Sequence, residues 1–160
     1  MDGVLADFTT AYTKLRTGAP DNAKRFRSSV MDHKIFETLE FMPDAHQLLN
    51  HVKHILNTSN DVHVEILTST GTHDPFQADE AKRQKKVWLA KHKIPYHPNF
   101  VNSKREKAQY ANKNSILIDD SIGCVSPFIE ANGLGILHTT ASNSIRILDS
   151  TLLQLRAINA

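Results

Sequence analysis

The residues best suited to chemistry are two adjacent carboxylates, Asp119 and Asp120, which follow the apolar run 115–118. Because like charges repel strongly in a partly desolvated site, such a pair needs a positive partner, and a divalent cation is a natural one. Oxygen ligands of this kind suit Mg²⁺, which takes one or two protein carboxylates and keeps several waters. The pair therefore predicts a magnesium site. The alternative is that Asp119 caps the following helix while Asp120 is solvated.

Three further polar side chains could act on a phosphate group. Thr68 and Ser69 follow the β-branched run 62–67 and precede Gly71, where hydroxyl and backbone donors suit phosphate oxygens. The same pattern is more often a simple turn. Lys107 stands 12 residues before Asp119 and could bring a positive charge to the same place, although a single lysine is more often solvated.

Alternating helical and strand patterns surround these residues. Apolar spacing predicts helices over 6–16, 43–57, 79–93, 123–131 and 144–155, a short helix around Lys107, and strands over 62–67, 99–102, 115–118 and 135–138. Residues 20–42 lack a clean period and are predicted to form a small helical insertion. The alternation predicts an α/β fold with a parallel sheet covered on both faces, in which polar strand ends meet at one edge.

Composition favours one domain over residues 1–160. With 40% hydrophobic and 22% charged residues, the chain resembles an ordinary globular protein. A net charge of +2 gives no strong nucleic-acid signal. No apolar run approaches the roughly 20 residues of a membrane span, and no signal-peptide pattern is present. We therefore expect a cytoplasmic protein that acts on a small molecule, and self-association stays open.

Other candidate sites are weaker. The nine histidines have no metal-binding spacing, and Gly133 with Gly135 lacks a dinucleotide fingerprint and is expected to form a turn before a strand. Cys124 has no obvious histidine partner and is predicted to be a buried structural thiol. The basic run 82–86 is predicted to form a solvated helix face, with a smaller chance of attracting an anionic substrate.

The order of the motifs resembles a known family. The segments are Asp2-Gly3-Val4-Leu5-Ala6-Asp7-Phe8, Ile66-Leu67-Thr68-Ser69, Lys107, and Leu117-Ile118-Asp119-Asp120. Together they are similar to the four motifs of phosphatases of the haloacid dehalogenase (HAD) superfamily. The first segment especially resembles the 5'(3')-deoxyribonucleotidases. The resemblance implies a three-layer Rossmann-like parallel sheet, with residues 20–42 as a small cap that sets substrate choice.

The resemblance also implies a role for each matched residue. Asp2 would be the general acid and base, with its backbone carbonyl on the metal. Thr68 and Ser69 would hold the phosphoryl oxygens, and Lys107 would neutralise charge on the nucleophile and the phosphate. The reaction implied is hydrolysis of a phosphomonoester through an aspartyl-phosphate. The substrate implied is a nucleoside monophosphate.

The remaining roles concern the metal and the nucleoside. By the same resemblance, Asp120 would be the direct Mg²⁺ ligand, Asp119 would orient or assist it, and Phe8 would contact the nucleoside. In the family the nucleophilic aspartate stands two residues before the acid/base aspartate. We therefore expect the nucleophile, and the first core strand that carries it, to precede Met1.

Two alternatives of other classes stay open. One is a catalytically inactive HAD-like module that keeps Asp2, Asp119 and Asp120 to bind a metal or a nucleotide and lacks the nucleophile. The other is a phosphate-accepting signalling domain of the flavodoxin type, in which the acidic pair should follow the first strand rather than stand late in the chain.

Overall fold

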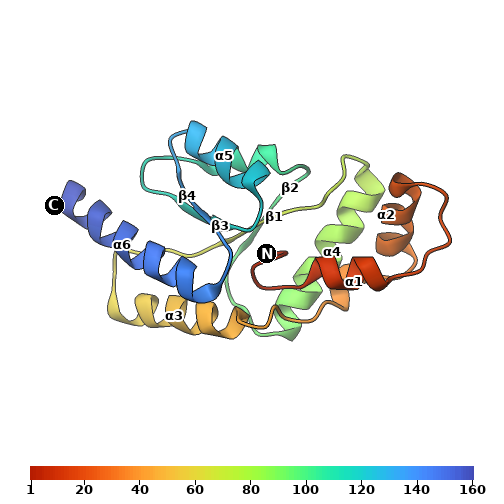
Figure 1. Ribbon diagram of the computed structural model, residues 1–160, viewed down its shortest axis with the longest axis horizontal. Coiled ribbons are helices and arrows are strands. Elements are labelled where there is room, and N and C mark those ends of the chain that lie inside the picture. The colour runs from red at the N-terminus through yellow and green to blue at the C-terminus, as the bar shows by residue number, and fades with distance from the viewer. The chain divides into compact units, whose positions relative to one another are not determined.

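The computed structural model describes residues 1–160 and contains six α-helices and four short strands (Figure 1). The chain divides into two compact units, which we describe separately. Unit 1 comprises residues 1–41 and 64–104, and unit 2 comprises residues 42–63 and 105–160. The strands form two parallel pairs, so the predicted mixed α/β class is confirmed. One continuous three-layer sheet is not confirmed, because each sheet has only two strands.

The sheet of unit 1 pairs β1 (Ile66–Ser69) with β2 (Pro98–Val101) in parallel, and α4 (Pro75–Lys91) connects them. The strand predicted over 62–67 is displaced toward Ser69, because Ile66 is the first residue with a partner on β2. Thr68 and Ser69 are therefore strand residues and not the turn after the strand. Asp74 caps α4 by accepting a hydrogen bond from the Gln77 amide at 2.9 Å.

The rest of unit 1 is helical. It contains α1 (Phe8–Lys14), α2 (Asn22–Met31) and the 3₁₀ helix η1 (Ile35–Glu37). Asp7 and Asp21 cap α1 and α2, each through a side-chain oxygen that accepts from an amide of the first turn. Since α2 and η1 fall inside residues 20–42, the helical character predicted for that segment is confirmed.

Polar side chains on α4 join it to this helical segment. Gln84, which is fully buried, accepts from the Phe36 amide at 3.1 Å and donates to the Val30 carbonyl at 2.7 Å. Trp88 Nε1 donates to the Leu39 carbonyl at 2.8 Å. Because buried polar groups are costly when unpaired, these bonds fix the segment to one face of α4.

Glu80 is the centre of a charged cluster on the same helix. It accepts hydrogen bonds from Arg83 at 2.7 and 3.0 Å and from Gln84 at 2.8 Å, and Lys34 lies 3.1 Å away. The hydrogen bond from Arg83, opposed by partial burial and supported by Gln84 and Lys34, lowers the pKa of Glu80 to about 2 from an ordinary value of 4.5.

Because of this cluster, the unfolding free energy of unit 1 should decrease in acid. Because the pKa of Glu80 is lower in the folded state, its stabilisation is complete above about pH 4.5 and disappears as the pH falls toward 2. We expect Glu80→Gln to lose about 1–2 kcal/mol of unfolding free energy at pH 7 and almost none near pH 2. Thermal unfolding across this pH range measures the difference. The control is Asp79→Asn, on the solvent face of the same helix, and an equal pH response in both variants would contradict the assignment.

The sheet of unit 2 pairs β3 (Ile116–Asp119) with β4 (Leu134–Leu137) in parallel, connected by α5 (Ile122–Glu130). The turn predicted before this strand is confirmed, with Gly133 directly before β4, but Gly135 is a residue of the strand itself. A Cβ atom at Gly133 would lie 2.3 Å from the Phe128 ring, and one at Gly135 would lie 2.7 Å from Val125 Cγ1. Glycine is therefore required for α5 to pack on β4.

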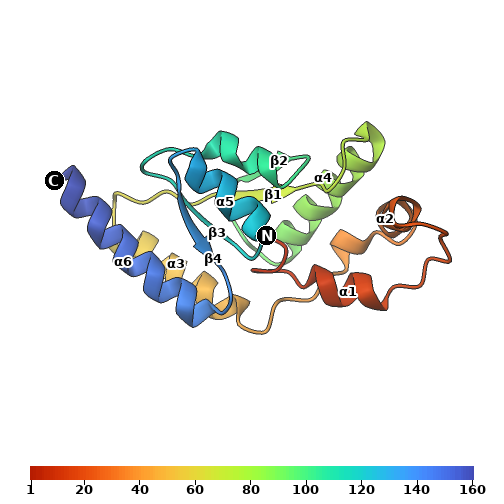
Figure 2. The same cartoon turned by 45° about the horizontal axis from the view of Figure 1, so that its top comes forward.

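Two long helices complete unit 2. Helices α3 (Ala45–Thr58) and α6 (Ala141–Asn159) lie side by side in both ribbon views (Figure 1, Figure 2). Ile55, Ile136 and Leu148 form the buried apolar cluster between these helices and the sheet. The 3₁₀ helix η2 (Arg105–Tyr110) packs on α5.

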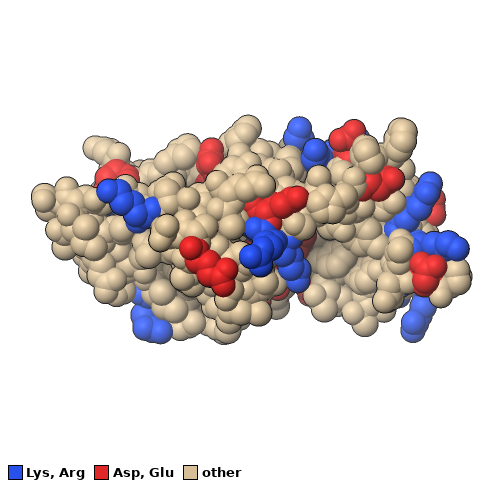
Figure 3. Space-filling model, turned by 90° about the horizontal axis from the view of Figure 1, so that it is seen from above, with Lys and Arg blue, Asp and Glu red and all other residues tan.

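None of the helices combines the length and the apolar content needed to cross a bilayer. On the face that Figure 3 shows, basic and acidic side chains are interspersed and do not form an extended patch of one sign.

Candidate functional site

In unit 1, the ammonium group of Lys85 binds three polar groups. Its side chain is fully buried on α4, and Nζ donates to Asp2 Oδ2 at 2.7 Å, to Thr68 Oγ1 at 2.8 Å and to the Ser69 carbonyl oxygen at 2.8 Å. Three acceptors match the three donors of an ammonium group. Three residues singled out from the sequence, Asp2, Thr68 and Ser69, therefore meet at one buried cation that the sequence reasoning missed.

Asp2 has two oxygens in different environments. Oδ2 is held by Lys85, whereas Oδ1 is buried and has no hydrogen-bond partner. A buried carboxylate oxygen without a partner is costly, and such atoms are concentrated where a ligand or a reacting group binds. Oδ1 is thus the oxygen of Asp2 that is left without a partner inside the protein.

The turn after β1 is shaped by Ser69 and Gly71. The Ser69 hydroxyl accepts from the Gly71 amide at 3.1 Å, so its own proton can still be donated. Gly71 has a φ of +77°, and a Cβ atom there would lie 2.9 Å from the Phe26 ring. Both the backbone conformation and the close ring require glycine at this position.

Aromatic rings cover the buried ammonium. The Phe36 ring centroid lies 4.4 Å from Lys85 Nζ, within the range of a cation–π interaction. Phe8 stacks on Phe36 at 5.4 Å and on Tyr12 at 5.1 Å between ring centroids. Phe8 therefore belongs to a stack of three rings beside the site. Its predicted contact with a nucleoside stays a prediction.

The prediction that residues 82–86 form a solvated helix face is wrong for Gln84 and Lys85, which are both fully buried. The physical reason is the helical period. Lys85 lies four residues after Ala81 and three before Trp88, and both of these residues are buried. Counting from those two apolar positions would have placed Lys85 on the inner face.

In unit 2, Lys107 and Asp119 form a buried ion pair. Their side chains are 6% and 4% exposed, and Nζ lies 2.6 Å from Oδ2. The other oxygen of Asp119 accepts from the Ser121 amide at 3.0 Å. Since Ser121 is the N-cap residue of α5, Asp119 does not cap the helix through an amide of its first turn. Its carboxylate is held instead by the lysine and the loop.

The charge of Asp119 is stabilised by these partners. Burial by itself raises the pKa of Asp119, but the charge of Lys107 and the hydrogen bonds from Lys107 and Ser121 outweigh it, so the pKa is lowered. Because the folded-state pKa is lowered, the stabilisation is complete above the ordinary carboxyl pKa of about 4 and is lost as the pH falls below it.

A histidine follows the neighbouring strand. His138 is buried, and its amide donates to the Asp119 carbonyl at 2.8 Å. Nδ1 lies 2.7 Å from the Ser144 hydroxyl, and Nε2 is buried without a partner. Burial lowers the pKa of His138, which favours a neutral ring. Cys124, on α5, is buried as predicted, and burial raises its pKa.

Asp120 differs from its neighbour because its side chain is exposed. An exposed carboxylate suits magnesium, which needs only one or two protein carboxylates and keeps its other positions for water and phosphate. The donor chemistry of Asp120 therefore fits the predicted ion. No three His, Cys, Asp or Glu side chains are placed to form a cation cage by themselves. The magnesium site at Asp2, Asp119 and Asp120 stays a prediction.

The predicted site residues thus form one group in each unit, Asp2 with Thr68 and Ser69, and Lys107 with Asp119. Comparison of the chain with protein-family models, with curated proteins and with solved structures gave no match. The functional assignment therefore depends on the motifs and on the geometry within each unit.

Proposed function

We propose that this protein is a magnesium-dependent phosphomonoesterase that acts on nucleoside monophosphates through an aspartyl-phosphate. The observation that carries the proposal is the meeting of Asp2, Thr68 and Ser69 at the buried ammonium of Lys85. The first of these residues lies at the start of the chain, and the other two end a strand more than 60 residues later. Their association supports a common role that the linear motifs suggested.

In this proposal Asp2 moves the proton. With Oδ2 held by Lys85, Oδ1 would give its proton to the nucleoside oxygen as the bond to phosphorus breaks, and the phosphoryl group would pass to a carboxylate oxygen of the nucleophile. Oδ1 would then take a proton from the water that hydrolyses the aspartyl-phosphate. The nucleophile is proposed to be an aspartate that precedes Met1, and the fold a Rossmann-like sheet completed by its strand.

Other side chains would hold the phosphoryl group and its charge. Thr68 and Ser69 would donate to phosphoryl oxygens, and Lys107 would offset negative charge while it fixes Asp119. Asp120, assisted by Asp119, would hold the magnesium ion, which when bound supplies further stabilisation of the charge on phosphate. The aromatic stack at Phe8 supports a planar base as the organic part of the substrate.

The metal part of the proposal is tested by Asp120→Asn. In an assay of phosphate release from a panel of nucleoside monophosphates, we expect this variant to lose at least about 100-fold of the magnesium-dependent rate. The fold should be unchanged, because the side chain of Asp120 is exposed. Asp149→Asn, an exposed carboxylate on α6, is the control and should keep the wild-type rate. Equal rates in wild type and Asp120→Asn would remove the metal assignment.

A further inference from the structure

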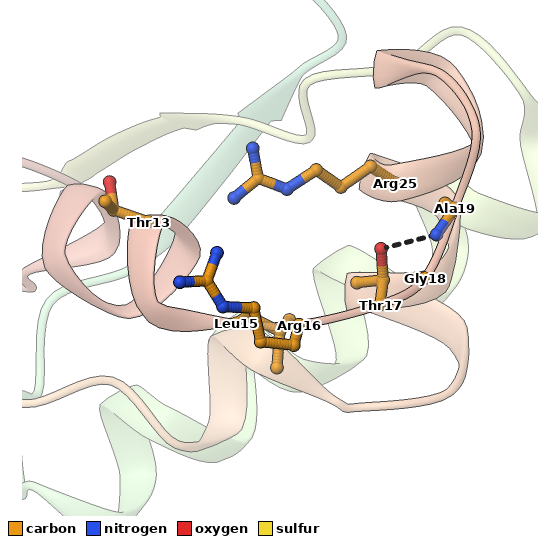
Figure 4. Close-up of a pocket in the computed structure, with 7 residues that line it drawn as sticks. All are labelled: Thr13, Leu15, Arg16, Thr17, Gly18, Ala19 and Arg25. Carbon is orange, nitrogen blue, oxygen red and sulfur yellow. Dashed lines mark hydrogen bonds between the residues drawn. The ribbon is translucent and has the colours of Figure 1, made fainter.

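A pocket lies in unit 1, lined by residues that the proposed function does not use. It has a volume of about 500 Å³ and is formed by the end of α1, the loop that follows it and Arg25 of α2 (Figure 4). Volumes of this size are typical of sites for small organic ligands. No acidic side chain lines the pocket, and two arginines do.

Arg25 is held in place before any ligand binds. Its Nη2 donates to the Tyr12 carbonyl at 2.5 Å, and its guanidinium carbon lies 4.2 Å from the centroid of the Tyr12 ring. A guanidinium carries five N–H donors, so most of them are left for another acceptor. Because its position is already fixed, less side-chain freedom is lost on binding.

Arg16 supplies a second guanidinium. Its side chain is exposed, and in Figure 4 it extends toward the same space as Arg25, with Thr13 at the other side. Two guanidinium groups that share a pocket without a carboxylate repel each other unless an anion lies between them. Their planar donors match the oxygens of a phosphoryl group.

The segment that surrounds the pocket adds further positive charge to that of the two arginines. Residues 13–27 contain five basic side chains and one acidic side chain, Asp21, whereas the whole chain carries only +2. The carboxylate of Asp21 already has partners, because it caps α2 and lies 3.9 Å from the ammonium of Lys24. Residues 13–27 therefore carry a net charge of +4, while the rest of the chain carries a net charge of −2.

The loop after α1 makes a turn at residues 17–19, on the wall of the pocket. The Thr17 hydroxyl accepts from the Ala19 amide at 3.2 Å, and Gly18 between them has a φ of +68°. A Cβ atom at Gly18 would meet nothing within 4 Å, so the positive φ and not crowding is what favours glycine in this turn. The exposed hydroxyl of Thr13 provides a further donor.

From these features we infer that the pocket binds the phosphoryl group of a small phosphorylated molecule, with Arg16 and Arg25 as its main contacts. The volume exceeds that of a phosphate ion, which leaves room for an organic part. The inference does not depend on the phosphatase proposal, because none of its residues belongs to the groups at Lys85 or Lys107.

Phosphate titration followed by amide NMR of the full chain tests the inference. At constant ionic strength, inorganic phosphate should shift the amides of residues 17–19 in a saturable way. Arg16→Gln should weaken this binding by about 10-fold. Arg27→Gln, an exposed arginine on α2 outside the pocket, is the matched control and should change it by less than about 2-fold. AMP should bind more tightly than phosphate, and adenosine should not compete.

Several results would overturn the inference. Shifts that grow linearly with phosphate, or that weaken equally in Arg16→Gln and Arg27→Gln, would mean that only general charge attraction acts. Displacement of phosphate by a short single-stranded DNA at lower concentration than AMP would replace the small ligand with nucleic acid. Because Arg16 is exposed, its variant should fold even where Arg25→Gln does not. Since the signal comes from residues 17–19, phosphate bound at Thr68 does not affect the result.

Discussion

Replacing Lys85 with methionine should lower the free energy of unfolding by about 3–5 kcal/mol. Methionine preserves most of the volume but removes the ammonium, so Asp2 Oδ2, Thr68 Oγ1 and the Ser69 carbonyl lose the donor that satisfies them. The Asp2 carboxylate would then be left without its ion-pair partner. Urea unfolding at pH 7, followed by circular dichroism, measures the change.

The neighbouring lysine provides a matched control for this variant. Lys86 is exposed on the same helix, and Lys86→Met should alter the unfolding free energy by no more than about 0.5 kcal/mol. If Lys85→Met and Lys86→Met had the same small effect, Lys85 could not be buried among these oxygens. Asp2→Asn combined with Lys85→Met should recover part of the loss, because it removes the uncompensated charge.

Lys107→Met should cause a loss of similar size in unit 2, again about 3–5 kcal/mol. The carboxylate of Asp119 is almost fully buried, and without Lys107 it would keep the hydrogen bond from the Ser121 amide but lose the ammonium that offsets its charge. The loss should shrink as the pH is lowered toward 4, because protonation of Asp119 then removes the unpaired charge. Chemical unfolding at several pH values measures both effects.

Two further variants separate this ion pair from general effects of charge. Lys104→Met removes an exposed lysine nearby in the sequence and should cost at most about 0.5 kcal/mol. The double variant Lys107→Met with Asp119→Asn should be more stable than Lys107→Met alone. A double variant that is less stable than the single one would show that Asp119 does not depend on Lys107 for its charge.

The helical and strand patterns predicted much of the local structure. The apolar run at 115–118 becomes β3 with Asp119 as its last residue, because a short buried strand can be recognised from its composition. The strand at 62–67 was displaced because its ends depend on pairing with β2, which no local pattern contains. Capping residues are local signals too, but the helix predicted over 79–93 did not use Asp74 and so began four residues after the start of α4 at Pro75.

The candidate site was predicted less completely. Asp2, Thr68 and Ser69 could be chosen from the sequence because each belongs to a motif, whereas Lys85 stands in a run of basic residues typical of solvated helices. Its burial depends on Asp2, more than 80 residues away in the chain, and on the Phe36 ring, which covers the ammonium. Tertiary contacts of this kind decide whether a lysine is buried. In the sequence, the apolar spacing of α4 was the one indication that Lys85 faces inward.

The measurement that tests the phosphatase proposal most directly is phosphate release by the natural gene product from deoxyribonucleoside and ribonucleoside monophosphates, with magnesium and with EDTA. N-terminal sequencing of the same sample shows whether an aspartate precedes Met1. We predict release that requires magnesium, together with an N-terminal sequence that includes this aspartate. No release from any nucleotide, or release that is equal in EDTA, would contradict the proposal.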